Sequence, residues 1–454
     1  MSGLLLALAL VPLGAASAQV SVHSASVMSA GAVTLRATPH ATINAIGYGA
    51  DTVGGSGRHL TPPATTIYHV TNLNNAGSGS LREALTAAGA RIIIFDLSGT
   101  IALATKINIL NPYVTIAGQS APSPGITLKD SGLSIKTHDV LIQHLRVRPG
   151  DGPVGQSPSS RDGIDIIGDA YNVVIDHASV SWAVDENMST WEDDGIRPRD
   201  ITISNSILSE GLHRSIHPEG PHSKGLLAGF GTKRLSVIRS LLAHNYDRHP
   251  EVQSGVEIAW VNNIIYDWVV RRATSLSGSS PWKAVLLGNK YIRGLSPDIF
   301  TPDAPAVIGI GVRTGAVVGS ELYMDDNEIV GVPTELYRNE ASFDPIVPSP
   351  PIALPSLLTV LPIGQVETHL LLNVGARPRD RDVVDARVIE QVENGTGQII
   401  DSQADVGGWP TLAVNTIDHT AEPGWPAANL HGINRATGYT YLEGYLEALA
   451  EQVE

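Results

Sequence analysis

The segment Ile258-Ala-Trp-Val261 is a short apolar run that ends at two asparagines, Asn262 and Asn263. Similar β-rich runs recur from about residue 92 to residue 330, at intervals of roughly 20 to 35 residues. The other runs are Arg91–Phe95, Tyr113–Ile116, Val140–Ile142, Asn172–Ile175, Asp200–Ile203, Leu235–Ile238, Ala284–Leu287 and Leu322–Met324. No amphipathic helix of convincing length interrupts them.

Most of these runs are followed by a polar residue where a turn would begin. These residues include Asp176, Ser204-Asn205, Arg239, Asn289 and Asp325. A short strand and turn that repeat in this way are typical of a β-solenoid, in which stacking closes a core that one coil cannot close alone. Asn side chains at equivalent corners are expected to form a hydrogen-bonded ladder. The sequence therefore predicts an all-β fold, a right-handed single-stranded parallel β-helix over residues 45–340.

A β-sandwich is the alternative, because short strands with turn signals also suit that fold. Sandwich hairpins favour two-residue Asn-Gly or Asp-Gly turns between alternating strands. The runs here are apolar at consecutive positions, as strands of parallel stacks often are. The pattern favours the solenoid.

The segments that flank the repeats predict how its ends are covered. Residues Gly79–Leu85 read as a short helix that caps the open end of the core. Residues 341–364 are rich in proline and are expected to form a long loop. Residues 365–454, with possible helices at 382–392 and 441–453, are expected to pack against the solenoid.

Composition limits the possible partners. The 454 residues hold 30 Lys and Arg against 45 Asp and Glu, a formal net charge of −15. Such a chain repels nucleic acids and anionic membranes overall. An acidic polymer could still bind through clustered basic residues or through a divalent cation held between carboxylates. The chain has no Cys, which excludes disulfides and thiolate sites. A monomer is favoured.

The N-terminus predicts export. Leu4 to Ala16 form a short apolar run, followed by small residues that suit a cleavage site, although no Lys or Arg precedes the run. We expect a signal peptide over residues 1–18, an extension over 19–44 and a secreted or periplasmic protein. A virion-associated protein with an uncleaved N-terminus is the alternative. The run is too short to span a membrane, and no later segment is long enough without charge.

The densest group of chemically active residue types lies between Arg146 and Arg248. Its segments are Asp162-Gly-Ile-Asp165, Ile175-Asp-His177, Trp182-Ala-Val-Asp-Glu186, His217-Pro-Glu-Gly-Pro-His-Ser-Lys224 and His244-Asn-Tyr-Asp-Arg-His-Pro250. Successive coils lie about 4.8 Å apart, so residues from neighbouring coils can line one groove. Carboxylates gathered in this way repel each other unless a hard cation, above all calcium, binds them. The plainer alternative is that these Asp residues only cap turns.

These segments resemble the bacterial pectate lyases of the β-helical polysaccharide lyase class. The matching segments are Gly47–Asp51, Val70–Asn74, Gly79–Leu85, Val114–Gln119, Asn172–His177, Asp185–Ser189, His217–Gly225, Ile400–Gln403 and Val406–Pro410. The resemblance covers about residues 45 to 450. It implies a parallel β-helix that uses calcium to cleave a polygalacturonate-like polymer by β-elimination.

The resemblance also implies residue roles. Asp162 and Asp185 match calcium ligands, Arg248 matches the arginine assigned as base, and Lys224 matches a lysine that contacts the substrate carboxylate. We expect His217, His222 and Arg146 to line the substrate side as well.

Some positions depart from the family pattern. Ser189 stands where many relatives have a second carboxylate, so Glu186 or Asp165 is expected to substitute. Asp165 is the weaker candidate, because three residues along a strand it should face away from Asp162. A second arginine shortly after Arg248 is missing, and the carboxylate-poor segment 418–424 argues against an accessory calcium site.

Three other functions stay open. Zinc could bind the histidines, but the prolines and glycine between His217 and His222 exclude the helical spacing of a zinc hydrolase motif. A β-helical glycoside hydrolase would use paired carboxylates, which the contexts of Lys224 and Arg248 disfavour. A carbohydrate-binding or attachment protein with a decayed site would explain Ser189.

Overall fold

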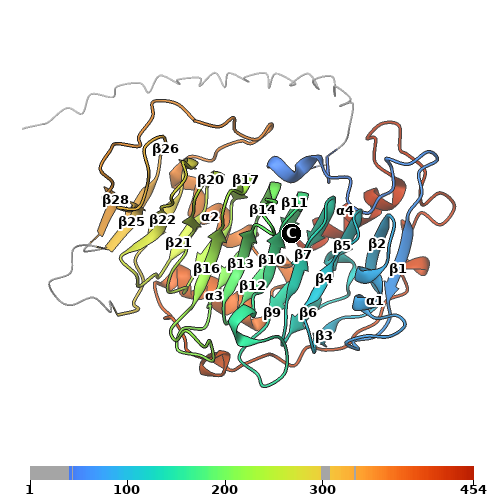
Figure 1. Ribbon diagram of the computed structural model, residues 1–454. Helices are drawn as coiled ribbons and strands as arrows, with labels where there is room; N and C mark the ends of the chain where they lie inside the picture. The colour runs from blue at the N-terminus through green and yellow to red at the C-terminus, as the bar shows by residue number, and fades with distance from the viewer. Residues whose placement is uncertain (1–39, 43, 298–306, 332–333) are drawn as a thin grey trace, which may run out of the picture. The chain divides into compact units, whose positions relative to one another are not determined.

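Three parallel sheets wind along one axis in a computed structural model that describes residues 40–42, 44–297, 307–331 and 334–454. Figure 1 shows the strands stacking along the axis, and the chain colour passes from blue at β1 to orange at β28. Neighbouring strands pair in parallel, as in β11 with β14, β12 with β15 and β13 with β16. The parallel β-helix is therefore confirmed over the described residues, and the sandwich alternative is wrong.

Each complete coil contributes one strand to each sheet, and we name the sheets after the strands of one coil. The β11 sheet holds β1 (Thr66–Val70), β2 (Arg91–Phe95), β5 (Val114–Ala117), β8 (Val140–Gln143), β11 (Tyr171–Asp176), β14 (Arg199–Ser204), β17 (Lys233–Ile238), β20 (Glu257–Val261), β23 (Lys283–Leu287) and β26 (Glu321–Asp325). The β12 sheet holds β3 (Gly99–Ala102), β6 (Ile126–Lys129), β9 (Arg146–Arg148), β12 (Ser179–Ser181), β15 (Ile207–Ser209), β18 (Leu241–Ala243), β21 (Ile264–Tyr266), β24 (Lys290–Ile292) and β27 (Glu328–Val330). The β13 sheet holds β4 (Ile107–Ile109), β7 (Leu133–Ile135), β10 (Ile164–Ile167), β13 (Glu186–Trp191), β16 (Lys224–Ala228), β19 (Glu251–Val252), β22 (Arg272–Leu276), β25 (Val307–Val312) and β28 (Thr334–Asn339).

The nine apolar runs of the sequence all belong to the β11 sheet, and both faces of that sheet are covered. In β11 itself, Val173 and Ile175 enter the central core, while Val174 packs outward against the segment near Ala41. Elsewhere on the outer face, α4 (Tyr441–Val453) covers Ile92 and Ile94. Residues 352–360 cover Ala259, Val261 and Val285. Apolar side chains at consecutive positions are therefore buried on two sides, which explains the continuous runs.

Asn side chains form the expected ladder where strands of the β11 sheet end. The Nδ2 of Asn263 donates to Asn289 Oδ1 at 3.1 Å, and the Nδ2 of Asn289 donates to Asn327 Oδ1 at 2.8 Å. The backbone N–H of Ser240 donates to Asn263 Oδ1 at 2.9 Å and extends the ladder by one coil. These bonds hold equivalent corners of neighbouring coils together.

Short helices close the solenoid. Helix α1 (Leu81–Thr86) begins after Ser80, whose hydroxyl accepts from the Glu83 N–H, and its Leu81 and Leu85 enter the first end of the core. The predicted capping helix is confirmed. The segment predicted as signal peptide lies outside the described residues, as does nearly all of the predicted extension.

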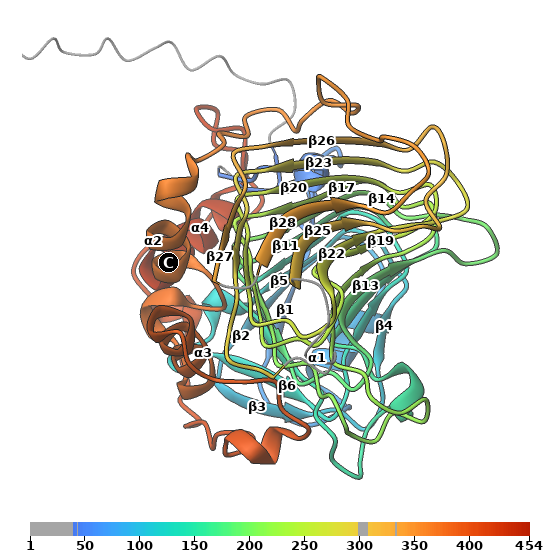
Figure 2. The same ribbon diagram turned by 90° about the vertical axis from the view of Figure 1, so that its left-hand side faces the viewer.

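The C-terminal region packs against the solenoid, as expected. Helices α2 (Ile363–Asn373) and α3 (Val383–Asn394) pack on the outer face of the β12 sheet against Ile207, Leu241 and Tyr266. Figure 2 shows them on the opposite side of the solenoid from β13, β19 and β22. The proline-rich segment is a loop, but α2 already begins within its last residues. Among the described residues, no helix is both long and apolar enough to cross a membrane.

Candidate active site

Except for Arg146, the predicted site residues lie on or beside the β13 sheet. Figure 2 shows this sheet on the opposite side of the solenoid from α2 and α3. Glu186 begins β13 and Lys224 begins β16, and the two residues are direct neighbours in the strand register. Glu251 begins β19, the next strand. Because parallel coils stack in register, residues more than 60 positions apart in the sequence form one row.

Three carboxylates converge at the acidic end of this row. Oxygens of Asp162, Asp185 and Glu186 all lie within 4.8 Å of one another. Oxygens that bind one calcium ion at 2.3–2.6 Å lie at most about 5 Å apart, so this group fits a calcium ion. The backbone N–H of Glu186 donates to Asp162 Oδ1 at 3.2 Å. This bond holds the Asp162 carboxylate against the neighbouring coil, which carries Glu186.

Lys106 is a member of the site that the sequence did not reveal. Its Nζ donates to Asp162 Oδ2 at 2.8 Å and also contacts Asp165 Oδ2. Burial lowers the pKa of Lys106, but the two carboxylates outweigh burial and raise the pKa above its usual value. Burial raises the pKa of Asp162, the charge of Asp185 adds to this effect, and Lys106 opposes it. A built-in cation thus offsets part of the acidic charge. Lys106 immediately precedes β4, far from the site motifs, and no sequence signal distinguished it.

The expectation that Asp165 faces away from Asp162 is wrong. Both carboxylates contact the same Lys106 ammonium. The two-residue alternation of a strand did not apply, because β10 begins at Ile164 and Asp162 lies in the turn before it. Asp165 is also the register neighbour of Ser189, so a carboxylate stands beside the position where this sequence departs from its relatives.

Arg248 lies at the basic end of the row, between two carboxylates. Its Nη1 contacts Glu186 Oε1, and its Nε lies 3.2 Å from Glu251 Oε2. The side chain is 21% exposed, so the guanidinium reaches the surface of the sheet. Glu186 therefore belongs both to the three-carboxylate group and to the arginine. Glu251 was not singled out in the sequence, because its partner became clear only from the register.

Lys224 lies between the acidic and basic ends. Its Nζ lies 3.2 Å from Asp247 Oδ2 and 5.7 Å from the centroid of the Tyr246 ring. The side chain is 12% exposed. The lysine is therefore held in place by its neighbours and keeps its ammonium near the open face.

His217 and His222 approach Asp185 from the following loop. Their Nε2 atoms lie 3.9 Å and 3.5 Å from Asp185 Oδ1, and their rings stack with centroids 3.4 Å apart. Burial, and next the neighbouring His222, lower the pKa of His217. The loop thus brings two histidines and a carboxylate within 4.8 Å of one another without the helical spacing of a zinc motif.

Arg146 does not belong to this face, and the expectation that it binds substrate is wrong. It lies in β9 of the β12 sheet, is fully buried and has its Nε 3.6 Å and 3.5 Å from Asp382 and Asp385. Arg148 beside it donates to the same two carboxylates. These arginines fasten α3 to the solenoid, a role that depends on a segment more than 230 residues away.

Another arginine lies two strands further along the sheet from β19. Arg313 follows β25, is 48% exposed and has its Nη1 3.7 Å from Glu251 Oε1. It extends the basic end of the row beyond Arg248.

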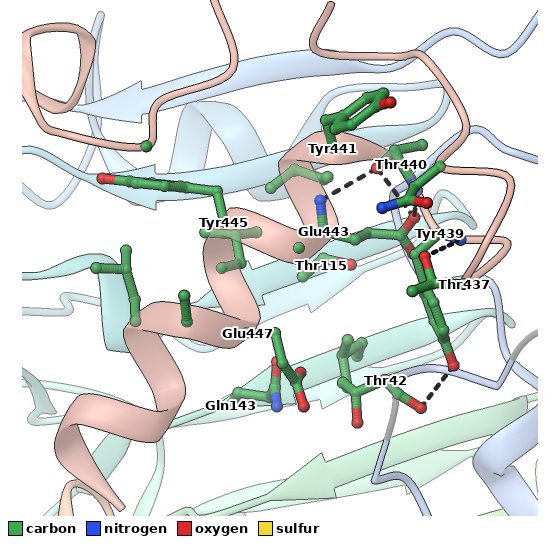
Figure 3. Close-up of a pocket in the computed structure, with 18 of the residues that line it drawn as sticks. Thr42, Thr115, Gln143, Thr437, Tyr439, Thr440, Tyr441, Glu443, Tyr445 and Glu447 are labelled. Atoms are coloured by element: carbon green, nitrogen blue, oxygen red, sulfur yellow. Dashed lines mark hydrogen bonds between the residues drawn. The ribbon is translucent and has the colours of Figure 1, made fainter. Parts of the chain in front are cut away.

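A cavity of about 410 Å³ lies elsewhere, between α4 and the outer face of the β11 sheet. Figure 3 shows Glu447, which projects from α4, beside Gln143, and Glu443 beside Thr440 at the start of the helix. None of the site residues above lines it.

The solenoid and the row of carboxylates beside Lys224 and Arg248 define the class: a parallel β-helix enzyme with acidic and basic residues side by side on one sheet. Two fungal relatives are both called "Probable pectate lyase C". The protein of Aspergillus oryzae is 31% identical over 428 residues, and that of Neosartorya fischeri is 31% identical over 422 residues. Each alignment covers 89% of this chain and 92% of the relative. The chain belongs to the pectate lyase family. These relatives are fungal, which corrects the bacterial branch that the motifs suggested.

Solved structures are similar over most of their length. The cedar-pollen allergen jun a 1 is 19% identical, with 73% of this chain and 92% of that chain covered and a TM-score of 0.49. A pectate lyase bound to a hexasaccharide is 16% identical, with 73% and 96% covered and the same TM-score. No protein-family model matches the chain.

Proposed function

We propose that this protein cleaves pectate, or a related uronate polymer, by calcium-assisted β-elimination and releases 4,5-unsaturated oligouronides. One observation carries the proposal: Glu186 belongs to the three-carboxylate group and also contacts Arg248. A cation site and a candidate base therefore lie side by side, as elimination next to a carboxylate requires. Membership of the pectate lyase family supports the same reaction.

Asp162, Asp185 and Glu186 would hold the calcium ion, with Asp165 as a further carboxylate behind Lys106. Calcium bound there would attract the uronate carboxylate and stabilise the negative charge that develops when the C5 proton leaves. The polymer's carboxylates would otherwise meet three carboxylates of the protein.

Arg248 is the proposed base. A guanidinium is an ordinary cation at neutral pH, and Arg248 contacts the carboxylates of Glu186 and Glu251. The base role therefore requires that the charge of Glu186 be compensated in the working enzyme. A strong base suits a weakly acidic carbon, and the C5–H bond electrons then form the C4–C5 double bond as the C4–O bond breaks and the leaving oxygen takes a proton from water.

Lys224 is proposed to hold a substrate carboxylate, because its ammonium stands between the carboxylate group and Arg248. His217 and His222 flank the same position through Asp185 and are proposed to donate to substrate oxygens. Arg313 would attract uronates further along the sheet.

The polymeric substrate and the N-terminal apolar run favour action outside the cytoplasm. A monomer is proposed as well, because one chain supplies the whole row of residues.

Polygalacturonate incubated with the protein, with and without calcium, tests the proposal. Elimination produces the near-ultraviolet absorbance of the new double bond only when calcium is present. Hydrolysis would produce reducing ends without that absorbance, and a binding protein would produce neither. Asp162→Asn and Asp185→Asn should each raise the calcium concentration needed for half-maximal rate. Unchanged calcium dependence in both variants would reject the metal assignment.

A further inference from the structure

A second group of metal-binding residue types lies at a corner of the solenoid, away from the β13 sheet. His144 follows β8 and His177 follows β11, so the two histidines occupy equivalent corners of successive coils. Their rings stack with centroids 5.0 Å apart and planes 12° apart. Glu454, the residue after α4, reaches this corner from the C-terminal region.

The three side chains surround one point. Glu454 Oε1 lies 3.5 Å from His144 Nε2 and 3.7 Å from His177 Nδ1, and one ligand atom from each residue lies within 4.8 Å of the other two. Ligands of a tetrahedral zinc ion, at about 2.0–2.1 Å from the metal, lie about 3.3–3.4 Å apart. Shifts of a few tenths of an ångström would bring both Glu454 contacts to that spacing.

His144 is the independent indication that a ligand belongs here. Its side chain is fully buried, its Nδ1 has no hydrogen-bond partner among the residues that the structure describes, and its Nε2 has only the contact of 3.5 Å with Glu454, which is long for a hydrogen bond. Buried polar groups are almost always paired, because leaving one unpaired forfeits its hydration without return. Stacking on His177 satisfies the ring faces but not the nitrogens. A metal ion bound at Nε2 would satisfy one of them.

The surroundings of His177 can complete a coordination sphere. Asp176 Oδ2 lies 3.0 Å from His177 Nδ1 and is oriented by hydrogen bonds from Ser204 and Asn205 to Oδ1. A metal ion bound at His177 Nδ1 would replace the proton of this contact with Asp176. A cavity of about 120 Å³ adjoins His177 and Glu454 and has room for water as a further ligand.

We propose that His144, His177 and Glu454 bind one divalent transition-metal ion of the zinc class. Imidazole nitrogens with one carboxylate suit zinc and its neighbours, whereas calcium prefers oxygen ligands alone. The ion would connect two coils of the solenoid to the end of α4, and its role would be structural and independent of the cleavage reaction.

Titration of the full, chelator-stripped chain with zinc chloride in calcium-free buffer tests this site. Calorimetry measures the stoichiometry, and cobalt(II) serves as a probe because tetrahedral cobalt absorbs in the visible range. Asp185, His217 and His222 form a second candidate group for zinc, so the matched control is His222→Gln. We expect His222→Gln to bind one equivalent of zinc. His144→Gln and Glu454→Gln should each weaken the affinity for that equivalent at least tenfold.

Thermal unfolding gives a second readout. Zinc should raise the Tm of the wild type and of His222→Gln by a few degrees, but not that of Glu454→Gln. The last variant is nearly isosteric at a side chain that is 34% exposed, so it should fold even if His144→Gln does not. Calcium-dependent cleavage should be unchanged in Glu454→Gln. The site is disproved if Glu454→Gln binds zinc as the wild type does, or if His222→Gln binds none.

Discussion

The Lys106 ammonium lies 2.8 Å from the Asp162 carboxylate, inside the group of acidic residues proposed to hold calcium. Lysine and a metal ion would compete for the same negative charge, since both are attracted to Asp162. The structure thus places a protein cation where the sequence predicts only ligands.

Replacing this lysine tests the competition. Lys106→Met should lower the calcium concentration for half-maximal activity by on the order of tenfold, because the site gains one net negative charge. Without calcium, the variant should lose about 3–5 kcal/mol of stability, because two buried carboxylates lose their partner. Calcium titrations of rate and of Tm measure both effects.

Lys233→Met is the matched control, since Lys233 pairs with Glu257 at 3.1 Å on the β11 sheet. An unchanged calcium requirement in Lys106→Met would contradict a shared site. Loss of activity at every calcium concentration would show that the lysine itself supplies the essential charge.

Arg248→Lys should lower turnover by roughly 10²–10⁴-fold, because it keeps a positive charge but removes the planar guanidinium that faces Glu186. Substrate binding should change much less. Steady-state kinetics at saturating calcium measure both. Arg234→Lys controls for the substitution itself, because Arg234 pairs with Asp200 on another sheet. Near-native turnover in a folded, calcium-binding Arg248→Lys would move the proton transfer to another group, with His217, His222 and His249 next to be tested.

Lys224→Ala should act mainly on KM, because the ammonium attracts the substrate carboxylate before and during the reaction. Loss of the lysine also leaves Asp247 without its partner at 3.2 Å, which adds repulsion toward a polyanion. We expect KM to rise about tenfold or more and kcat to fall less. Lys233→Ala should leave both constants unchanged. A loss confined to kcat would instead assign Lys224 to proton transfer.

The raised pKa of Glu447, on α4, predicts that the stability of the fold depends on pH. Burial, and next the charge of Glu454, raise its pKa to about 7 from an ordinary 4.5. A carboxyl whose pKa is raised by folding stabilises the fold fully below its unfolded pKa, and that contribution is lost as the pH rises through the folded value. Stability should therefore fall between about pH 5 and pH 8, by less than about 3 kcal/mol because the side chain is partly exposed.

Urea unfolding at pH 5 and pH 8, in chelator to keep metals away from Glu454, measures this effect. Glu447→Gln should remove most of the difference between the two pH values. Glu390→Gln, an exposed position on α3, should keep it. An equal pH dependence in wild type and Glu447→Gln would assign the loss to other groups.

The sequence by itself determined the β11 sheet and the elements at its ends. The nine runs such as Ile258–Val261 are long and apolar because both faces of that sheet are buried, and this leaves a local signal. Ser80 and Gly395 mark the start of α1 and the end of α3 by capping, which is also local. The acidic and basic motifs from Asp162 to Arg248 were visible for the same reason.

Only the tertiary structure decided the rest, because it depends on strand register and on segments distant in sequence. Strands of the β12 sheet are three or four residues long and β19 of the β13 sheet has only two, so these strands leave no periodic signal. Lys106 contacts Asp162, which lies 56 residues later in the chain, and Arg148 contacts Asp382, which lies 234 residues later. Arg146 reads as a surface cation in the sequence and is buried in the fold, since the long-range partners that neutralise it are chosen by packing and not by its neighbours in the chain.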